Sequence, residues 1–240
     1  MAAGLAPGTY SAVVRVTNGL VSRDTTFTYT LTVVGGAKWM HDKNGYWYKY
    51  ADGSYPKNQW AEINGKWYHF DANGYMQTEW LKLSDKWYYL GTDGAMKVGW
   101  KQISGKWYYF NDSGVMITGW KQISGKWYYF NDSGVMITGW KQISAGWYYF
   151  ESSGVMATGW KTISGKTYFF KSGGEMAAKE WCGGYYLNSD GTWTYQYKAS
   201  WKQDAKGWWY GDTSGWYAKS TTITIDGKSY TFDAKGYWVK

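Results

Sequence analysis

A repeat of 20 residues constrains this chain more than any other feature. Residues 101–120 read KQISGKWYYFNDSGVMITGW, and residues 121–140 are identical to them. The period extends in both directions, because tryptophan recurs every 20 residues from position 60 to position 160 and methionine from position 76 to position 176. A fixed period of this length is typical of repeat architectures, in which each unit is stabilised by its neighbours.

Each repeat predicts a β-hairpin. The segments W-K-Q-I-S and W-Y-Y-F are rich in strand formers, and Ser104-Gly105 lies between them, with Asn64-Gly65 and Asp226-Gly227 in other units. Asn-Gly and Asp-Gly between apolar runs favour the type I′ turn, because that turn needs a positive φ at both central residues. A single hairpin is marginal in water, so the units must stack. We therefore expect an all-β fold, a solenoid of stacked β-hairpins.

Strand alternation then assigns the side chains of a repeat to two faces. A turn at Ser104-Gly105 and a turn at Gly105-Lys106 give the same assignment, because side chains alternate with a period of two. We expect the second face to supply the core and the rings of the first face to line the grooves between hairpins. The first face carries Trp100, Gln102, Trp107 and Tyr109, and the second carries Lys101, Ile103, Tyr108 and Phe110.

The two ends of the array differ from its middle. Residues 39–76 match residues 201–238 at a constant offset of 162, as expected for related variant repeats that cap a solenoid. Residues 1–36 alternate like two strands with a turn near Asn18-Gly19, but are too short to bury a core alone. We predict the end of a β-sandwich at 1–36, variant N-terminal repeats at 37–78, central repeats at 79–182 and variant C-terminal repeats at 183–240.

Composition and charge exclude several classes of protein. Aromatic residues make up 22% of the chain, which argues against disorder, and no apolar run approaches the roughly 18 residues of a membrane span. The net charge of +8 favours polyanionic partners, but the lysines are evenly spaced, which argues against nucleic acid. The single Cys182 allows no internal disulfide, and zinc-ligand spacing is absent. Since no catalytic or phosphate-binding motif is present either, we expect no catalysis, no cofactor and no metal.

The tryptophans on the groove face indicate a ligand, because a regular row of exposed apolar rings is costly to maintain. Sugars stack on single rings with polar groups beside them, whereas a quaternary ammonium needs several rings whose negative faces surround it. Two tryptophans and a tyrosine, with one methionine per repeat to fill an irregular gap, fit the second arrangement better. Carbohydrate binding and a purely structural spacer remain as alternatives.

The run G-W-K-Q-I-S-G-K-W-Y-Y-F-N-D-S-G-V-M-I-T-G-W resembles the choline-binding (cell-wall-binding) repeat of Gram-positive surface proteins and lytic enzymes. The resemblance covers about residues 38–240 and is most specific at 79–160. It implies a left-handed superhelix that binds the choline of teichoic and lipoteichoic acids between consecutive hairpins, and an extracellular, cell-wall-associated location. Residues 1–36 resemble bacterial immunoglobulin-like modules more weakly. Related units of clostridial toxins and glucan-binding domains hold carbohydrate, but they more often carry Tyr or Lys where this chain has both tryptophans.

In that family two tryptophans of one hairpin and a tyrosine of the next surround choline, with a methionine nearby. The repeat breaks at Thr167, where a tryptophan is expected, so we expect ligand binding to stop near residue 169. Carried over to this sequence, the resemblance implies sites at Trp80, Trp87 and Tyr109, at Trp100, Trp107 and Tyr129, at Trp120, Trp127 and Tyr149, and at Trp140, Trp147 and Phe169, with Met96, Met116 and Met136 alongside.

Overall fold

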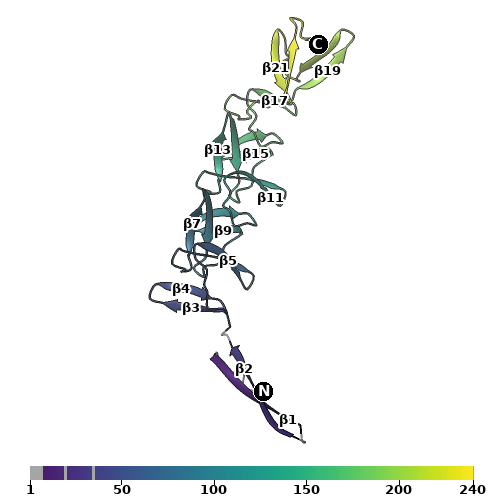
Figure 1. Cartoon of the computed structure of the whole chain (residues 1–240). Coiled ribbons are helices and arrows are strands. Elements are labelled where there is room, and N and C mark those ends of the chain that lie inside the picture. The colour runs from purple at the N-terminus through teal and green to yellow at the C-terminus, as the bar shows by residue number, and fades with distance from the viewer. Residues whose placement is uncertain (1–7, 19–20, 34–35, 240) are drawn as a thin grey trace. The chain divides into compact units, whose positions relative to one another are not determined.

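The computed structural model describes residues 8–18, 21–33 and 36–239, which form strands and connecting turns without any helix (Figure 1). The predicted all-β fold of repeated hairpins is confirmed. The chain divides into two compact units, one of residues 1–101 and 109–116 and the other of residues 102–108 and 117–240.

The first unit begins with two antiparallel strands, β1 (Gly8–Asn18) and β2 (Val21–Val33). They agree with the two strands expected there. The predicted turn near Asn18-Gly19 includes positions outside the described residues, and the immunoglobulin-like module remains a prediction. Three hairpins follow, and the boundary between the units passes through a fourth: β3 (Lys38–Asp42) with β4 (Gly45–Lys49), β5 (Gln59–Ile63) with β6 (Lys66–Phe70), β7 (Glu79–Leu83) with β8 (Lys86–Leu90), and β9 (Gly99–Ile103) with β10 (Lys106–Phe110).

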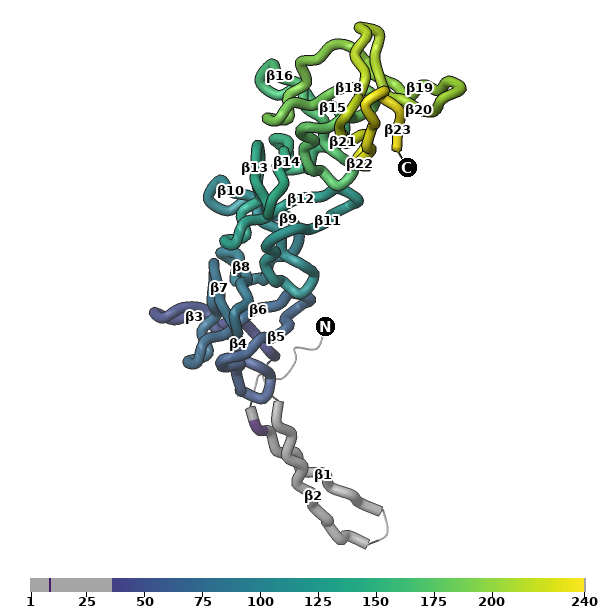
Figure 2. The backbone as a smooth tube through the Cα atoms, turned by 90° about the horizontal axis from the view of Figure 1, so that it is seen from above, coloured from purple at the N-terminus to yellow at the C-terminus, as the bar shows by residue number. Residues whose placement is uncertain are grey.

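The second unit continues with three regular hairpins and then changes. Figure 2 shows β13 beside β14 in one of the regular hairpins. These are β11 (Gly119–Ile123) with β12 (Lys126–Phe130), β13 (Gly139–Ile143) with β14 (Gly146–Phe150), and β15 (Gly159–Ile163) with β16 (Lys166–Phe170).

The C-terminal part of the second unit contains the largest sheet in the described part of the chain. Five strands lie in the order β18-β17-β21-β22-β23, and β17 pairs in parallel with β21 through Trp181 and Ile225. A separate hairpin, β19 with β20, lies between them in sequence. The bounds are β17 (Glu180–Cys182), β18 (Tyr185–Leu187), β19 (Ser200–Asp204), β20 (Gly207–Gly211), β21 (Thr221–Ile225), β22 (Lys228–Phe232) and β23 (Trp238–Val239).

The turn of each regular hairpin sets its register. In the β11–β12 hairpin, Ser124 has φ 49° and Gly125 has φ 77°, and Ile123 pairs with Lys126. Two consecutive positive φ values are those of a type I′ turn, whose twist matches that of the flanking strands. The turn therefore consists of Ser-Gly, the first of the two registers considered. Trp120 lies opposite Tyr129 and Gln122 opposite Trp127, which confirms the groove face derived from the alternation.

The opposite face of each hairpin provides the core. Its phenylalanines are completely buried, and Tyr148 is 9% exposed, whereas Trp127 on the groove face is 42% exposed. The fully buried rings of the regular repeats are Phe70, Phe110, Phe130, Phe150 and Phe170.

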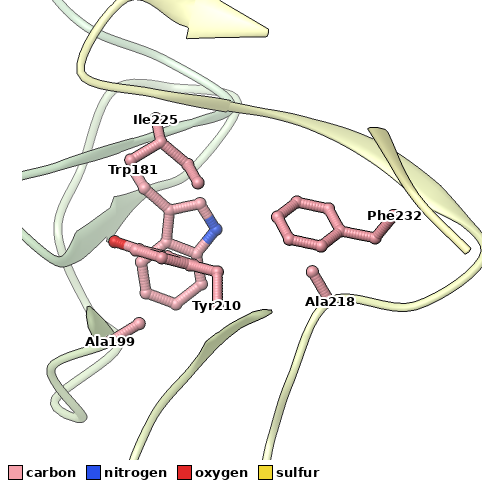
Figure 3. Packing of buried hydrophobic residues seen from close by; sticks show 6 residues of the cluster. All are labelled: Trp181, Ala199, Tyr210, Ala218, Ile225 and Phe232. Atoms are coloured by element: carbon pink, nitrogen blue, oxygen red, sulfur yellow. The ribbon is translucent and has the colours of Figure 1, made fainter. Parts of the chain in front are cut away.

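The C-terminal core is built differently. Figure 3 shows Trp181 of β17 surrounded by side chains from later segments, among them Tyr210 and Ile225. The Trp181 and Tyr210 ring centroids are 5.5 Å apart in an edge contact, and the Trp216 ring stacks on Trp181 at 4.7 Å. In the regular repeats the buried phenylalanines form a ladder of core rings. In this cluster Trp181 takes the central place instead.

Replacing one of the ladder rings tests the core. Phe150 is fully buried and lies 5.7 Å from Trp120 of the preceding hairpin. We expect Phe150→Ala to lower the free energy of unfolding by about 3 to 5 kcal/mol, the usual cost of emptying such a site. Urea unfolding measures this. Trp127→Ala, on the exposed face, is the matched control and should cost clearly less; equal losses would contradict the assignment of the two faces.

The single cysteine is part of the core rather than a reactive site. Cys182 is buried, and burial raises the pKa of its thiol to about 12, with the Glu180 and Asp226 charges adding to the effect. A raised pKa means less thiolate at any pH below it. At pH 8 we expect native Cys182 to react with iodoacetamide roughly a thousandfold more slowly than the denatured chain. Comparable alkylation rates in the native and denatured states would show that the thiol is accessible.

Candidate functional site

The groove faces of the β7–β8, β11–β12 and β13–β14 hairpins each carry a pair of nearly perpendicular indole rings. In the β11–β12 hairpin the ring centroids of Trp120 and Trp127 lie 6.2 Å apart with an interplanar angle of 85°. The type I′ turn fixes their positions, because it places Trp120 and Trp127 on the same side of two adjacent strands. The two rings therefore form two walls of a corner that is open to solvent at Trp127.

The next hairpin supplies a third wall. The Tyr148 ring, from β14, lies 5.0 Å from the Trp120 ring at 66°. The loop after β14 then returns to the first hairpin, where the Met156 backbone N–H donates a hydrogen bond to the Trp127 carbonyl at 2.9 Å. The Met156 side chain leaves no room for a Cβ at Gly174, which has φ 86°, so glycine is required there. We call such a set of two tryptophans, one tyrosine and one methionine an aromatic cluster.

The aromatic cluster recurs one repeat later. Trp140 and Trp147 lie 6.4 Å apart at 79°, and the Tyr168 ring lies 4.9 Å from Trp140. The Met176 N–H donates to the Trp147 carbonyl at 2.7 Å. Three rings and the main-chain hydrogen bond of the methionine thus reproduce the arrangement around Trp120 with closely similar distances.

The first unit holds an equivalent cluster. Trp60 of β5 lies 5.2 Å from Tyr88 of β8, and the Met96 N–H donates to the Trp67 carbonyl at 2.8 Å. These residues line a cavity of about 350 Å³ together with Asp112 and Ser113. Three aromatic rings and one carboxylate thus line the same cavity.

The third ring of a cluster differs from the one that the resemblance implied. Tyr149, expected beside Trp120 and Trp127, instead pairs with Trp140 of its own hairpin at 5.3 Å. The residue that reaches Trp120 is Tyr148. Likewise Tyr109, Tyr129 and Phe169 pair with the tryptophan of their own hairpin, at 5.2 Å from Trp100, 5.1 Å from Trp120 and 5.1 Å from Trp160.

The reason lies in how hairpins stack. Tyr149 shares the groove face of its hairpin with Trp140, and its ring lies 6.4 Å from that of Phe170 in the following hairpin. The core face, with Tyr148 and Phe150, is the one that meets Trp120. The third wall therefore comes from the first tyrosine of W-Y-Y-F rather than from the second.

The backbone N–H of each of these methionines bonds to the carbonyl of a tryptophan two strands earlier in the chain. Met116 donates its N–H to the Trp87 carbonyl and Met136 to the Trp107 carbonyl, both at 2.8 Å, so each lies at one of the expected pairs. Met96 instead joins Trp67, outside the expected sites. The aromatic clusters also include residues outside the sites that the resemblance implied, and the period of 20 identifies the tryptophans and methionines among them: Trp60, Trp67, Tyr88, Tyr148, Tyr168, Met156 and Met176.

The break at Thr167 changes one wall but keeps the backbone arrangement. Thr167 stands where the second tryptophan is expected, and its hydroxyl lies 3.0 Å from that of Thr162. Trp193 occupies the methionine position, because its N–H donates to the Thr167 carbonyl at 2.7 Å. Trp160 then contacts Tyr185 at 5.6 Å and Trp193 at 5.8 Å.

The variant repeats at the two ends retain related ring sets. In the second unit Trp201 lies 4.9 Å from Tyr230 and 6.0 Å from Trp238. In the first unit Trp39 lies 4.9 Å from Tyr68, and the Met76 N–H donates to the Tyr46 carbonyl at 2.7 Å. The end repeats therefore keep the contact between a tryptophan and the first tyrosine of the next hairpin.

Carboxylates accompany the rings. The Tyr148 hydroxyl donates to Glu175 Oε1 at 3.1 Å, and burial, together with this hydrogen bond, raises the pKa of Tyr148. Asp112 lines the Trp60 cluster. In the part of the chain that the structure describes, no group of three His, Cys, Asp or Glu residues could hold a metal ion, and no helix is long and apolar enough to span a membrane.

These features define a hairpin-repeat protein with recurring aromatic clusters. The sequence matches the choline-binding repeat at residues 57–98, 97–138, 117–156 and 137–181, which together run from residue 57 to residue 181 of 240. The chain belongs to the choline-binding repeat family. Proteins of this family are surface or cell-wall-associated proteins of Gram-positive bacteria.

Solved structures agree with this assignment. Choline-binding protein F from Streptococcus pneumoniae, in the presence of a peptidoglycan analogue, is 32% identical over 79% of this chain and 72% of that chain, with a TM-score of 0.65. CbpJ from Streptococcus pneumoniae TIGR4 is 28% identical over 97% of this chain and 71% of that chain, with a TM-score of 0.51. No curated protein sequence matches the chain.

The raised pKa of Tyr148 can be measured directly. Because burial and the Glu175 hydrogen bond both favour the protonated hydroxyl, we expect Tyr148 to ionise above pH 10, the usual value for tyrosine. Tyrosine labelled with ¹³C at Cζ, with the Tyr148 signal identified from its loss in Tyr148→Phe, reports the titration. A midpoint below pH 10 would contradict the buried, hydrogen-bonded position.

Proposed function

We propose that this chain is a non-catalytic cell-wall attachment module whose aromatic clusters bind the choline of teichoic and lipoteichoic acids in an extracellular, cell-wall-associated setting. The observation that carries the proposal is the recurring contact between a perpendicular tryptophan pair and the tyrosine of the next hairpin. Membership of the choline-binding repeat family supports it.

The geometry suits a quaternary ammonium. A cation without N–H donors gains nothing from hydrogen bonds, but it is attracted by the negative faces of several rings at once. Trp120 and Trp127 present faces at nearly a right angle, and Tyr148 adds a third ring. Glu175, hydrogen-bonded to Tyr148, adds a negative charge nearby. The site therefore offers a cation several favourable surfaces and little to a neutral ligand.

The strength of a single site follows from these contacts. Each cation–π contact contributes about 0.5 to 2 kcal/mol, and three contacts less the cost of association leave an affinity of order millimolar. Attachment to the wall then comes from several sites that engage one polymer. The net charge of +8 favours the approach of a polyanionic polymer such as teichoic acid.

Within each unit the proposal assigns the same roles to equivalent residues. Two tryptophans and the first tyrosine of the next hairpin surround the ammonium, and the methionine fills the remaining gap. The sets are Trp60, Trp67, Tyr88 and Met96 in the first unit, and Trp120, Trp127, Tyr148 and Met156 with Trp140, Trp147, Tyr168 and Met176 in the second.

Removing one ring tests the assignment. We expect Trp127→Ala to bind one choline fewer than the unchanged chain in isothermal titration calorimetry, because one wall of one cluster is lost. Gln122→Ala, on the paired residue of the neighbouring strand, is the matched control and should keep the full number. Glucose oligomers serve as the alternative ligand. Saturable glucan binding without choline binding would overturn the proposal.

Restoring a ring is the complementary test. Thr167 occupies the place of the second tryptophan beside Trp160, which already contacts Tyr185 and Trp193. We expect Thr167→Trp to add one choline site in the same calorimetric measurement, whereas Thr167→Leu should add none. An unchanged choline number in the tryptophan variant would show that two perpendicular indoles do not define a site.

A further inference from the structure

Two cavities outside the aromatic clusters are built from equivalent residues, one in each unit. The first, of about 180 Å³, is lined by Asp42, Trp47, Tyr55, Asn73 and Tyr75. The second, of about 240 Å³, is lined by Asp204, Trp209, Tyr217, Lys235 and Tyr237. The five pairs are separated by the same offset of 162 residues. The same kind of cavity therefore occurs twice in the chain, and we call the two copies the end cavities.

The end cavities lie on the opposite hairpin face from the tryptophan that begins each end repeat. Trp47 pairs across the strands with Met40, whereas Trp39 pairs with Tyr48. In the second copy Trp209 pairs with Lys202, whereas Trp201 pairs with Tyr210. Since alternate residues point to opposite faces, Trp47 and Trp209 do not share a face with Trp39 and Trp201. They are available to a different ligand.

The polar side of each end cavity is an aspartate carboxylate that hydrogen bonds hold in place. The Tyr75 hydroxyl donates to Asp42 Oδ2 at 3.1 Å, and the Asn44 N–H donates to Asp42 Oδ1 at 2.8 Å. In the second copy the Tyr237 hydroxyl donates to Asp204 Oδ2 at 2.9 Å.

The same carboxylate remains able to bind a ligand. The Lys206 N–H donates to Asp204 Oδ1 at 2.7 Å, and this bond and that from Tyr237 lower the pKa of Asp204. The Gly207 N–H also donates to Asp204 Oδ1 at 3.3 Å. Since an ionised carboxylate has about four lone-pair positions, about one remains on Asp204 and about two on Asp42 for ligand hydroxyls.

The apolar side is an aromatic corner. Trp47 and Tyr55 lie 5.5 Å apart at 66°, and Trp209 and Tyr217 lie 6.3 Å apart at 82°. Tyr55 is 39% exposed and Tyr217 is 38% exposed, so both rings can be reached from solvent. An aromatic wall with a few convergent polar groups is the usual design of a small-molecule site.

The lysines near the end cavities favour a neutral ligand over a cation. Lys57 Nζ lies 4.6 Å from the centre of the Tyr55 ring, and Lys219 Nζ lies 5.4 Å from that of Tyr217. In the second copy Lys202 Nζ also lies 4.7 Å from the Trp209 ring. None of these three lysines lines its end cavity, where Trp47 or Trp209 remains accessible, but their positive charge opposes the binding of a second cation. A ligand with an uncharged apolar face and several hydroxyls matches the remaining surface.

We propose that each end cavity binds one neutral pyranose unit of a glycan, at a site separate from those proposed for choline. The sugar ring stacks on the indole of Trp47 or Trp209. Its hydroxyls donate to Asp42 or Asp204 and accept from Asn73 or Lys235. The two copies give the chain two glycan sites, one in each unit, that do not depend on bound choline.

Indole N–H signals of the full chain, labelled with ¹⁵N-tryptophan, provide the test. Signals of Trp47, Trp209 and Trp127 are identified from their loss in the corresponding Trp→Phe variants. The probes are cellotetraose, chitotetraose and, separately, choline. We expect at least one tetrasaccharide to shift the Trp47 and Trp209 signals saturably and to leave Trp127 unchanged, and choline to leave Trp47 and Trp209 unchanged.

Substitution of the carboxylates separates a sugar site from a merely structural corner. We expect Asp42→Asn and Asp204→Asn, combined, to weaken tetrasaccharide binding at least fivefold, with the same number of choline sites and a similar melting temperature. Asp85→Asn, an exposed turn carboxylate of another hairpin, is the control and should change nothing. The proposal is overturned if neither sugar shifts the Trp47 and Trp209 signals, if sugar shifts only Trp127, or if the double variant binds sugar as before.

Discussion

Contact between the tryptophan of one hairpin and the core face of the next is the interaction on which this structure depends. A two-residue turn and two short strands cannot bury enough surface to be stable alone. Trp120 meets both Tyr148 and Phe150 of the following hairpin, and Phe150 is completely buried as a result. The same contact, repeated, turns marginal hairpins into a folded array whose core consists of rings rather than of branched aliphatic side chains.

The site proposed for choline is a consequence of this packing. Trp120 takes part in both the core and the proposed site, because its ring contacts Phe150 and also forms a corner with Trp127. Tyr148 likewise takes part in both, since it is buried in the core and its ring forms the third wall of the proposed site. Only Trp127 is largely exposed, and it is the residue most free to serve the ligand. Folding therefore preorganises the site, and binding does not have to order the rings.

Much of this could be predicted from the sequence, because local rules decide it. The Ser124-Gly125 turn fixed the register, and strand alternation then placed Trp120 and Trp127 on one face. Alternation does not say which face of a hairpin meets its neighbour, and the family resemblance, which implied Tyr149 beside Trp120, does not indicate that Tyr148 makes this contact. The parallel pairing of Trp181 with Ile225 could not be predicted either, because it joins segments 44 residues apart without any local signal.

The irregular repeat at Thr167 shows why the array tolerates variation. The backbone hydrogen bond from the loop to the preceding hairpin is kept, from the Trp193 N–H to the Thr167 carbonyl, although both side chains differ from the regular pattern. The Trp193 indole N–H finds its own acceptor in the Tyr195 carbonyl at 2.6 Å. The contact between consecutive hairpins is therefore maintained by the main chain and by the buried Phe170, while the groove-face residues can change. The exposed groove-face positions can therefore change without loss of the backbone contact between hairpins, and the end repeats carry a different kind of cavity within the same fold.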